Sequence, residues 1–392
     1  MRTLEGITVL TFEHAIAAPF CTRHLADLGA RVIKVERPGT GDFGRSYDSR
    51  TRGLASHFVW VNRTKESVTL DIKHPHARPV LDALIDKADI VVQNLAPGAA
   101  ARLGLSWEPL SKRNPRAILC DISGYGPDGP YRDKKAYDLL IQSESGHVSI
   151  TGSPEQPAKS GASIADISAG MYAYSNILAA LLRRIGSGLG SHIEVSMLES
   201  MTEWTSYALY YSYDGADPPA RAGASHAAIF PYGPFQAADG STVILAVQNE
   251  REWLAFCQKV LERPDLAGCD ACAGNAKRVA ARDELKTIVD AVFSTLSGVQ
   301  VVERLDAAGI ANARMNSMSD VWEHPQLKAR DRWTDIDSPV GKLRALLPPG
   351  MTRADDPQMG AVPALGEHTR AVLGELGFGP EQVDALRADK VI

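Results

Sequence analysis

One carboxylate in the middle of the chain stands between small residues. Residues 161–170 read Gly-Ala-Ser-Ile-Ala-Asp-Ile-Ser-Ala-Gly, and the apolar spacing that follows, from Met171 to Leu182, predicts a long helix. Asp166 is therefore a candidate catalytic group at the start of a helix. Since Asp and Ser are also preferred at helix N-termini, local rules alone favour a capping role. Its context in the rest of the chain has to decide between these interpretations.

A second group of side chains able to do chemistry lies at residues 134–138. The segment reads Lys-Lys-Ala-Tyr-Asp, so two cations and the carboxylate of Asp138 flank a tyrosine. A solvated run of charges is the alternative interpretation. Just before it, residues 124–129 match the phosphate-loop pattern G-x-G-x-x-G, but Pro127 and Pro130 remove backbone donors that a phosphate needs. We interpret that match as a turn-rich loop.

The composition is that of a soluble globular protein with more than one domain. The chain has 392 residues, 44% of them hydrophobic, and a net charge of -5 that is spread along the sequence. No basic stripe indicates a nucleic-acid or membrane partner, and no apolar stretch approaches the length of a membrane span. The N-terminus leads straight into a strand-like run without a signal peptide. We therefore expect a cytoplasmic protein that acts on small molecules.

The five cysteines predict free thiols rather than a disulfide framework. Cys269 and Cys272 form one C-x-x-C pair, but no second pair and no suitable histidine follows to complete a tetrahedral zinc site. We interpret the pair as a coincidence within a loop and expect no bound metal.

Alternating strand and helix patterns in the first half predict a mainly parallel sheet covered on both faces. The strand-like runs are residues 6–12, 30–36, 89–94, 117–122 and 192–197, and the helical patterns are residues 20–28, 77–87, 99–103 and 198–213. Glu36 closes the second strand as in dinucleotide-binding folds, but the first turn, residues 13–19, lacks the glycines that admit a pyrophosphate. This argues against nicotinamide or flavin binding. Ligands in such folds gather at the carboxyl ends of strands, which here means His14, Arg37 and Asn94.

The composition changes twice after the first domain. Residues 215–223 are small and proline-rich like a linker, and Asp239-Gly240 between two apolar runs predicts a hairpin, followed by helical patterns. From about residue 313 loops and short strands precede two final helices. We expect a large α/β domain at residues 1–214, a small α+β domain at residues 224–312, and a linker with the last part of the large domain at residues 313–392.

Several separate stretches, taken together, resemble the family III CoA transferases over essentially the whole chain. They are Phe12-Glu13-His14 with Ala17-Ala18-Pro19, Leu28-Gly29-Ala30 to Glu36-Arg37, Asn62 to Lys65 with Leu70 to Lys73, Asn94 with Pro97-Gly98, Lys135 to Asp138, and Asp166 among its small neighbours. The resemblance implies a Rossmann-like large domain, a smaller domain, a C-terminal tail that returns to the large domain, and an interlocked homodimer.

The resemblance also implies a mechanism. Asp166 occupies the position of the family's nucleophile, which attacks the donor thioester and then carries CoA as an aspartyl thioester. Such a reaction uses the coenzyme A thioester as a substrate and needs no permanently bound cofactor and no metal. Asp138 falls on an acidic position near the active site, where we expect an orienting role. The positions that resemble CoA contacts are His14, Ala15, Arg37, Leu70, Lys73, Asn94, Arg102, Lys135, Tyr137 and Met197.

Finer resemblance concerns the acid substrate. Formyl and oxalate members carry a glycine-rich loop where this chain has residues 221–233, whereas residues 137–142, the loop around His226 and residues 248–253 look more like dicarboxylate members. These handle mesaconate, citramalate, itaconate or succinate. A second negative charge needs a cationic or donating partner, so we expect Arg221 or His226 to bind the distal carboxylate.

The main alternative is an α-methylacyl-CoA racemase of the same fold. Those relatives use a histidine and an aspartate as the two bases, and the histidine comes from a Gly-His-Asp segment. Here Ala136 and Tyr137 precede Asp138, so that imidazole is missing. A CoA-binding protein without turnover and a nicotinamide oxidoreductase are further alternatives, and the first is disfavoured because Asp166 is retained.

Overall fold

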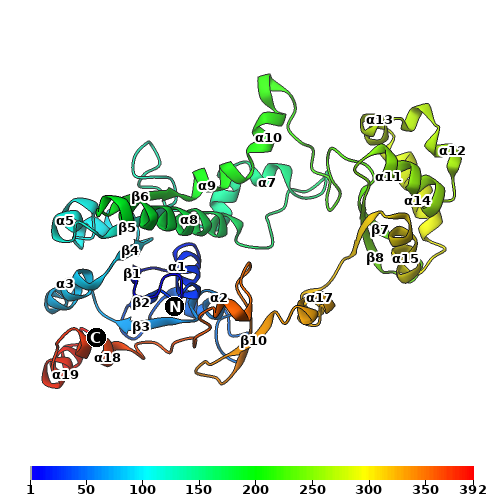
Figure 1. The fold of residues 1–392 in the computed structure, drawn as a ribbon. Coiled ribbons are helices and arrows are strands. Elements are labelled where there is room, and N and C mark those ends of the chain that lie inside the picture. Colours follow the sequence, from blue (N-terminus) through cyan, green and yellow to red (C-terminus); the bar gives the residue numbers. More distant parts are fainter. Residues whose placement is uncertain (1) are drawn as a thin grey trace. The chain divides into compact units, whose positions relative to one another are not determined.

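A six-stranded parallel sheet forms the centre of the first unit (Figure 1) in the computed structural model, which describes residues 2–392. The strands lie side by side in the order β3-β2-β1-β4-β5-β6. The chain begins with the central strand β1, adds β2 and β3 on one side, and then adds β4, β5 and β6 on the other. A ligand site is expected where the order reverses, at the carboxyl ends of β1 and β4. The strands are β1 (Thr8–Phe12), β2 (Arg31–Glu36), β3 (Lys65–Thr69), β4 (Ile90–Gln93), β5 (Ile118–Ser123) and β6 (Ser191–Ser196).

Helices cover both faces of this sheet. The helices with residues in these two cores are α1 (Ala17–Asp27), η2 (Pro75–Ala77), α3 (Arg78–Lys87), α4 (Ala99–Arg102), α5 (Trp107–Arg113), α6 (Asp138–Glu144), α8 (Ile164–Ser187), α9 (Met197–Trp204), α18 (Thr369–Glu375) and α19 (Pro380–Ala388). The unit also contains η1 (Phe43–Ser46), α2 (Ser56–Asn62) and η6 (Arg353–Asp355), whereas α7 (His147–Ile150) and α17 (Pro325–Ala329) each span a boundary between the two units.

The side chains of successive strand residues alternate between two hydrophobic cores. Val9 and Val32 pack with α1 and α8 on one face, whereas Leu10 and Ile33 pack with α3, α18 and α19 on the other. Such runs of consecutive apolar residues are what a strand buried on both faces requires. The sheet and α8 therefore form one rigid support for the residues at the strand ends.

Helix α8 lies very close to α1, and a glycine permits this. At Gly170 a Cβ would lie 2.7 Å from the carbonyl oxygen of Ala17 and 3.0 Å from the ring of Phe20. Since real Cβ atoms do not approach a carbonyl so closely, only glycine fits without moving one of the helices. Gly170 is one turn after Asp166, so this contact also fixes the position of the candidate nucleophile.

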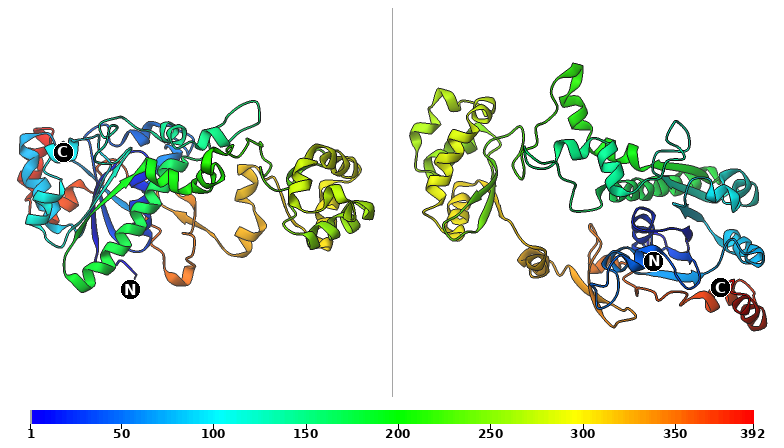
Figure 2. Two further views of the ribbon diagram at one scale, coloured as in Figure 1. Left: turned by 90° about the horizontal axis from the view of Figure 1, so that it is seen from above. Right: turned by 180° about the vertical axis from the view of Figure 1, so that it is seen from behind.

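The C-terminal segment adds its helices and a hairpin to the same unit. The hairpin is β10 (Trp333–Ile336) with β11 (Leu343–Leu346), antiparallel. Beside β3, the amide of His368 donates to the carbonyl of Ser67 (3.0 Å), and the amide of Asp71 donates to the carbonyl of Val391 (2.7 Å). Helices α18 and α19 lie next to α3 (Figures 1 and 2). The last helices thereby complete the core on that face.

The second unit combines a three-stranded antiparallel sheet, in the order β7-β8-β9, with helices around its own core. Its elements are α10 (Ser206–Tyr211), η3 (Tyr213–Gly215), β7 (Tyr232–Gln236), β8 (Thr242–Ala246), α11 (Glu250–Ala255), the π-helical turn η4 (Phe256–Val260), α12 (Pro264–Ala267), η5 (Asp270–Cys272), α13 (Asn275–Ala280), α14 (Arg282–Phe293), α15 (Gly298–Ala308), β9 (Ala311–Arg314) and α16 (Met318–Trp322). The predicted hairpin at Asp239-Gly240 joins β7 to β8.

The chain divides at different residues from those expected. Within the described residues, the first unit comprises residues 2–147, 160–206 and 327–392, and the second comprises residues 148–159 and 207–326. The short segment 148–159 goes with the second unit because the guanidinium of Arg221 donates to the carbonyls of Ser149, Ser153 and Pro154 at 2.9 to 3.2 Å. The amide of Gly223 also donates to the carbonyl of Gly152 at 2.8 Å. Both contacts come from far along the chain, and no local sequence pattern predicts them.

One predicted helix is interrupted in the structure, and one strand of the sheet was not predicted. The helix expected at residues 198–213 is interrupted at Thr205, where α9 ends and α10 follows. Strand β3 was not predicted, because its first residues, Lys65 and Glu66, are charged. Lys65 is nevertheless fully buried and pairs with Glu13 at 2.7 Å. Strand prediction relies on apolar residues, and the sequence does not show that this lysine is buried beside a carboxylate.

Within residues 2–392, no single helix has the length and apolar composition needed to cross a membrane. The helices α14 and α15 meet that test only as a pair, and they are bent by 113°.

Candidate active site

Asp166 lies in the first turn of α8 with its side chain half-buried. Burial, followed by the nearby negative charge of Asp138, raises the pKa of Asp166 to about 7. The positive end of the helix dipole acts in the opposite direction but does not prevail. A carboxylate that is poorly solvated and repelled by a neighbour is a better nucleophile than one in water, so the environment suits covalent catalysis.

The start of α8 is capped by a residue from another element. Ser163 occupies the N-cap position but makes no side-chain cap, and the Oδ1 atom of Asp138 instead accepts from the backbone amides of Ala165 (2.9 Å) and Asp166 (3.3 Å). Its Oδ2 atom accepts from the side-chain amide of Gln142 at 2.6 Å. Asp138 thus fixes the backbone that carries Asp166 and also supplies negative charge that helps to raise its pKa. These hydrogen bonds are compatible with the orienting role expected for Asp138, which stays a prediction.

His14 and Asn94 meet at the reversal point of the sheet. The backbone amide of His14 donates to Oδ1 of Asn94, and Nδ2 of Asn94 donates to the carbonyl of His14, both at 2.9 Å. Ala15 follows with a positive φ of 61°, and its amide donates to Oδ1 of Asp42 at 3.1 Å. Two of the strand-end residues expected at a ligand site are therefore joined by direct hydrogen bonds.

Residues 42–47 contribute groups that the sequence analysis missed. The ring of Phe43 stacks on the imidazole of His14, with centroids 5.3 Å apart. Burial, followed by the negative charge of Asp166, raises the pKa of Tyr47 to about 12, so Tyr47 remains a protonated donor near the candidate nucleophile. Both side chains are 45% exposed, which leaves them accessible to a ligand. A pair of aromatic residues separated by four positions in a loop was the only available signal.

The other residues with expected CoA contacts fall into two groups. Exposed side chains that a ligand can reach are those of Arg37, Lys73, Arg102, Lys135 and Tyr137. Leu70 and Met197 are instead buried in the two cores, at 2% and 7% exposure. Leu70 and Met197 could therefore touch a ligand through little besides their main-chain atoms.

The two candidates for the distal carboxylate differ in availability. Three donors of the Arg221 guanidinium are taken by backbone carbonyls of its own unit. His226 is exposed, stacks on Tyr232 with centroids 5.2 Å apart, and accepts from the amide of Ala228 through Nδ1. The structure therefore gives Arg221 a structural function within the second unit, whereas His226 still presents its ring edge to solvent.

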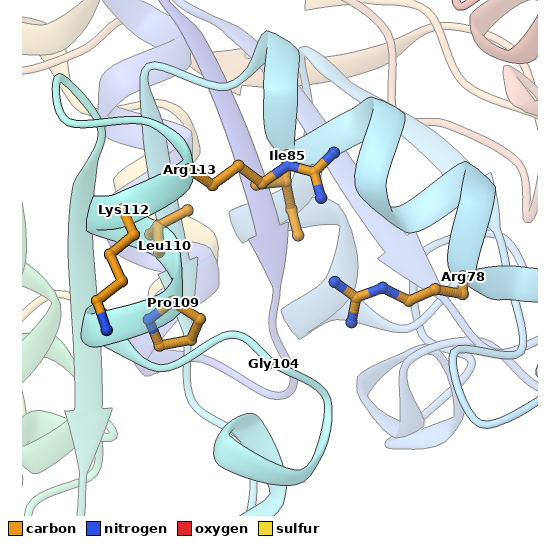
Figure 3. Close-up of a pocket in the computed structure, with 7 residues that line it drawn as sticks. All are labelled: Arg78, Ile85, Gly104, Pro109, Leu110, Lys112 and Arg113. Atoms are coloured by element: carbon orange, nitrogen blue, oxygen red, sulfur yellow. The ribbon is translucent and has the colours of Figure 1, made fainter.

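A hollow of about 440 Å³ lies elsewhere on the first unit (Figure 3). Arg78 reaches into it from α3, while Lys112 and Arg113 border it on α5. Each of these cations is paired with a carboxylate of the same two helices at 2.6 to 2.8 Å. Its charges are thus already balanced, and it contains none of the candidate site residues.

No group of three or more His, Cys, Asp or Glu side chains that could hold a metal ion occurs among residues 2–392. The C-x-x-C residues Cys269 and Cys272 lie at η5 in the second unit, with Cys272 buried.

The sequence model of CoA-transferase family III matches residues 4–369, nearly the whole chain. The chain belongs to this family. It is similar to the succinyl-CoA:glutarate CoA-transferase of Mus musculus, with 34% identity over 100% of this chain and 91% of the relative. The succinyl-CoA:mesaconate CoA-transferase of Haloarcula hispanica is 32% identical over 97% of this chain and 98% of that protein.

Among solved structures, a CaiB/BaiF family protein from Brucella suis aligns with a TM-score of 0.84 and 31% identity, covering 96% of this chain and 99% of its own. Membership in family III makes this protein a CoA-transferase with acyl-CoA and a carboxylic acid as substrates. The similarity predicted from separate sequence stretches is thereby confirmed at the level of the family.

Proposed function

We propose that the protein transfers CoA from an acyl-CoA such as succinyl-CoA to a C4 or C5 dicarboxylic acid, with Asp166 as the nucleophile. The observation that carries the proposal is the setting of Asp166, a half-buried carboxylate whose pKa is raised to about 7 and whose backbone is fixed by Asp138. Relatives named for succinyl-CoA with glutarate or mesaconate support the class of acid.

In the first half of the reaction the Asp166 carboxylate attacks the carbonyl carbon of the donor thioester. The C–S bond breaks, CoA leaves as a thiolate, and a mixed anhydride joins Asp166 to the donor acyl group. The thiolate then attacks the Asp166 carbonyl of this anhydride. The donor leaves as a carboxylate, and CoA is held as an aspartyl thioester.

The second half reverses these steps with the acceptor. Its carboxylate attacks the aspartyl thioester, which releases the thiolate and forms a second anhydride, and the thiolate then attacks the acceptor carbonyl. The new CoA ester departs and Asp166 is regenerated as a carboxylate. No net proton or electron is exchanged. Both covalent intermediates hydrolyse in water, so the bound substrates have to exclude solvent from Asp166.

Binding of CoA is proposed for the residues around the strand ends. The exposed cations Arg37, Lys73, Arg102 and Lys135 can pair with its phosphates, and Arg offers the bidentate geometry that phosphate favours. His14, Ala15, Asn94 and Tyr137 line the approach, while Leu70 and Met197 contribute through main-chain atoms. His226 is our candidate for the distal carboxylate of the acid.

We also propose that the protein acts as a homodimer. Residues 204–213 expose a run of large apolar side chains: Trp204, Tyr207, Leu209, Tyr210, Tyr211 and Tyr213 are all 43% to 75% exposed. Exposed aromatic side chains are enriched at protein interfaces. Light scattering coupled to gel filtration should give twice the chain mass, and a monomeric mass would contradict this proposal.

The function is tested by incubating the protein with succinyl-CoA and one acid at a time, with new CoA esters identified by mass spectrometry. The acids are glutarate, mesaconate, itaconate, citramalate, malate, oxalate and formate. Esters of the longer dicarboxylates should form with the wild type and not with Asp166→Ala. Exclusive use of oxalate or formate would refute the proposed acid class.

The racemase alternative has one observation in its favour, because an imidazole does lie near Asp138. Burial lowers the pKa of His147, and the charge of Asp138 partly opposes this effect. The two oxygens of Asp138 are, however, already bound to backbone amides and to Gln142. Deuterium uptake at C2 of a 2-methylacyl-CoA, without any CoA exchange, would identify a racemase.

A further inference from the structure

Four fully buried charges lie beneath the turn that carries His14. They are Glu13, Lys34, Asp42 and Lys65, two carboxylates and two ammonium groups. Nζ of Lys34 lies 2.7 Å from Oδ2 of Asp42 and 3.4 Å from Oε1 of Glu13, while Nζ of Lys65 lies 2.7 Å from the same Glu13 oxygen. The cluster is therefore electrically balanced without any solvent.

Neutral partners satisfy the remaining atoms of this cluster. Glu13 accepts from the hydroxyls of Thr11 (2.8 Å) and Thr22 (2.7 Å), and both lysines donate to Oδ1 of Asn62, at 3.0 and 3.2 Å. Buried ion pairs rarely add stability over a well-packed apolar core, because desolvation offsets the attraction. The cluster is therefore weak evidence for a stabilising role, and the contacts of Asp42 indicate a different one.

The two oxygens of Asp42 have different partners: Oδ2 pairs with Lys34 in the buried cluster, and Oδ1 binds backbone groups of the candidate site. Oδ1 accepts from the amides of Gly44 (2.8 Å) and Ala15 (3.1 Å) and lies 3.8 Å from Nδ1 of His14. Asp42 is thus the N-cap of η1, which begins with Phe43. The same carboxylate holds both partners of the stack between Phe43 and His14.

The turn at Ala15 requires such a contact. Its φ of 61° lies in the left-handed region, which an alanine adopts only when its surroundings hold it there. Asn94 binds the amide and the carbonyl of His14 from one side, and Asp42 binds the amide of Ala15 from the other. Without Asp42, Ala15 would favour a backbone conformation with negative φ. The side chain of His14 would then move away from the ring of Phe43.

We propose that Asp42, held in place by the buried Lys34, is a positioning residue for acyl-CoA, because it preorganises His14, Ala15 and Phe43 into a preformed binding surface. This inference rests on the proposed function, since it presumes that CoA binds at this turn. Asp42 itself need not touch the substrate. Its loss should weaken binding of the thioester far more than it slows the chemistry at Asp166.

The test uses Asp42→Asn, which keeps the shape but removes the charge that pairs with Lys34. A matched control is Asp27→Asn, because Asp27 is equally buried in the same unit and pairs with Arg23 at 2.8 Å and with Arg63, away from the turn. For each protein, KM and kcat are measured with succinyl-CoA and saturating glutarate, and the Kd of free CoA is measured by calorimetry.

We expect Asp42→Asn to raise the KM for succinyl-CoA and the Kd of CoA at least about tenfold, and to change kcat by less than about threefold. Asp27→Asn should lower the melting temperature but leave both constants within about twofold of the wild type. Asp42→Ser provides a second variant, since serine can still cap Gly44 but is too short to hold Ala15, and it should raise both constants as well.

If Asp42→Asn and Asp42→Ser fold and keep the wild-type KM for succinyl-CoA and Kd of CoA, the inference is wrong. It is also wrong if Asp27→Asn raises both constants as much as Asp42→Asn does, because any buried carboxylate of this unit would then have the same effect. A wild-type protein that binds no CoA and transfers none would refute the proposed function itself. The binding measurement therefore separates failure of the positioning inference from failure of the function on which it rests.

Discussion

Replacing the candidate nucleophile should make the protein more stable while abolishing its activity. The pKa of Asp166 is raised from its ordinary value of 3.8 to about 7, chiefly by burial. At neutral pH, ionisation of this carboxyl therefore lowers the free energy of the unfolded chain more than that of the folded protein, which destabilises the folded state. The side-chain amide of the Asp166→Asn variant carries no charge in either state, so that cost disappears.

The magnitude follows from the size of the shift. Each pKa unit corresponds to about 1.4 kcal/mol, so a shift of roughly three units sets an upper limit of about 4 kcal/mol above pH 7. Solvent reaches part of the half-buried carboxyl, and we therefore expect a gain of about 1–2 kcal/mol, or a melting temperature about 1–3 °C higher for a chain of 392 residues.

The sign depends on pH in a defined way. At pH 3 Asp166 is mostly protonated in the folded and the unfolded chain, so Asp166→Asn and the wild type should be about equally stable. As the pH rises towards 7, only the unfolded chain ionises, and the wild type loses stability relative to the variant. The difference should reach a plateau above pH 7.

The assay is urea unfolding of both proteins from pH 3 to pH 8, with Asp48→Asn as a control of opposite sign. Hydrogen bonds from Ser56 and Arg50 lower the pKa of Asp48 to about 2, so its replacement should destabilise the protein above pH 4. A difference between Asp166→Asn and the wild type that does not vary with pH would refute this reasoning about Asp166. So would a variant that is less stable at pH 8.

Further predictions concern the support of the site. Gly170→Ala should cost about 1–3 kcal/mol and lower kcat, since its Cβ would strike α1, whereas Gly186→Ala on the same helix has open space and should be neutral or slightly stabilising in thermal unfolding. Asp138→Asn removes a negative charge beside the nucleophile, so the midpoint of the pH–rate profile should move to lower pH, and an unchanged midpoint would contradict the assigned electrostatics. Arg221→Ala should cost about 2 kcal/mol of stability, because three backbone carbonyls lose a charged donor. His226→Ala should raise the KM for dicarboxylates about tenfold and leave the stability unchanged. If instead Arg221→Ala raised this KM and His226→Ala lowered the stability, Arg221 would be the better candidate for the substrate ligand.

Much of the parallel sheet could be predicted from the sequence, because its strands are apolar and short-range patterns suffice for them. The strands within residues 6–12 and 89–94 are almost entirely buried, with side chains on both faces of the sheet. Their continuous apolar sequences predict strands without any tertiary information. The positions of His14, Arg37 and Asn94 at strand ends followed from the same reasoning. The prediction that Asp166 is the nucleophile came from family resemblance, whereas its position at a helix N-terminus alone favoured a cap.

The supporting contacts could not be predicted, because they join residues far apart in the chain. Ser163 has the right type and position for an N-cap, yet Asp138 takes that function from another helix. Lys34 and Lys65 are charged residues in strands, and only the folded structure brings Glu13 and Asp42 to neutralise them. The sequence predicted Arg221 as a possible substrate ligand, but it gave no sign that this guanidinium donates to carbonyls of the segment 149–154.

The most direct test of the proposed function is to capture the covalent intermediate on Asp166. The protein is mixed with succinyl-CoA, treated with hydroxylamine and digested, and the peptide that contains residues 161–170 is examined by mass spectrometry. Hydroxylamine displaces CoA from an aspartyl thioester and leaves a hydroxamate on the aspartate, so we expect this modification at Asp166 only in the presence of the CoA ester. Transfer of CoA to glutarate without any hydroxamate at Asp166, or a hydroxamate on a different carboxylate, would contradict the proposed mechanism.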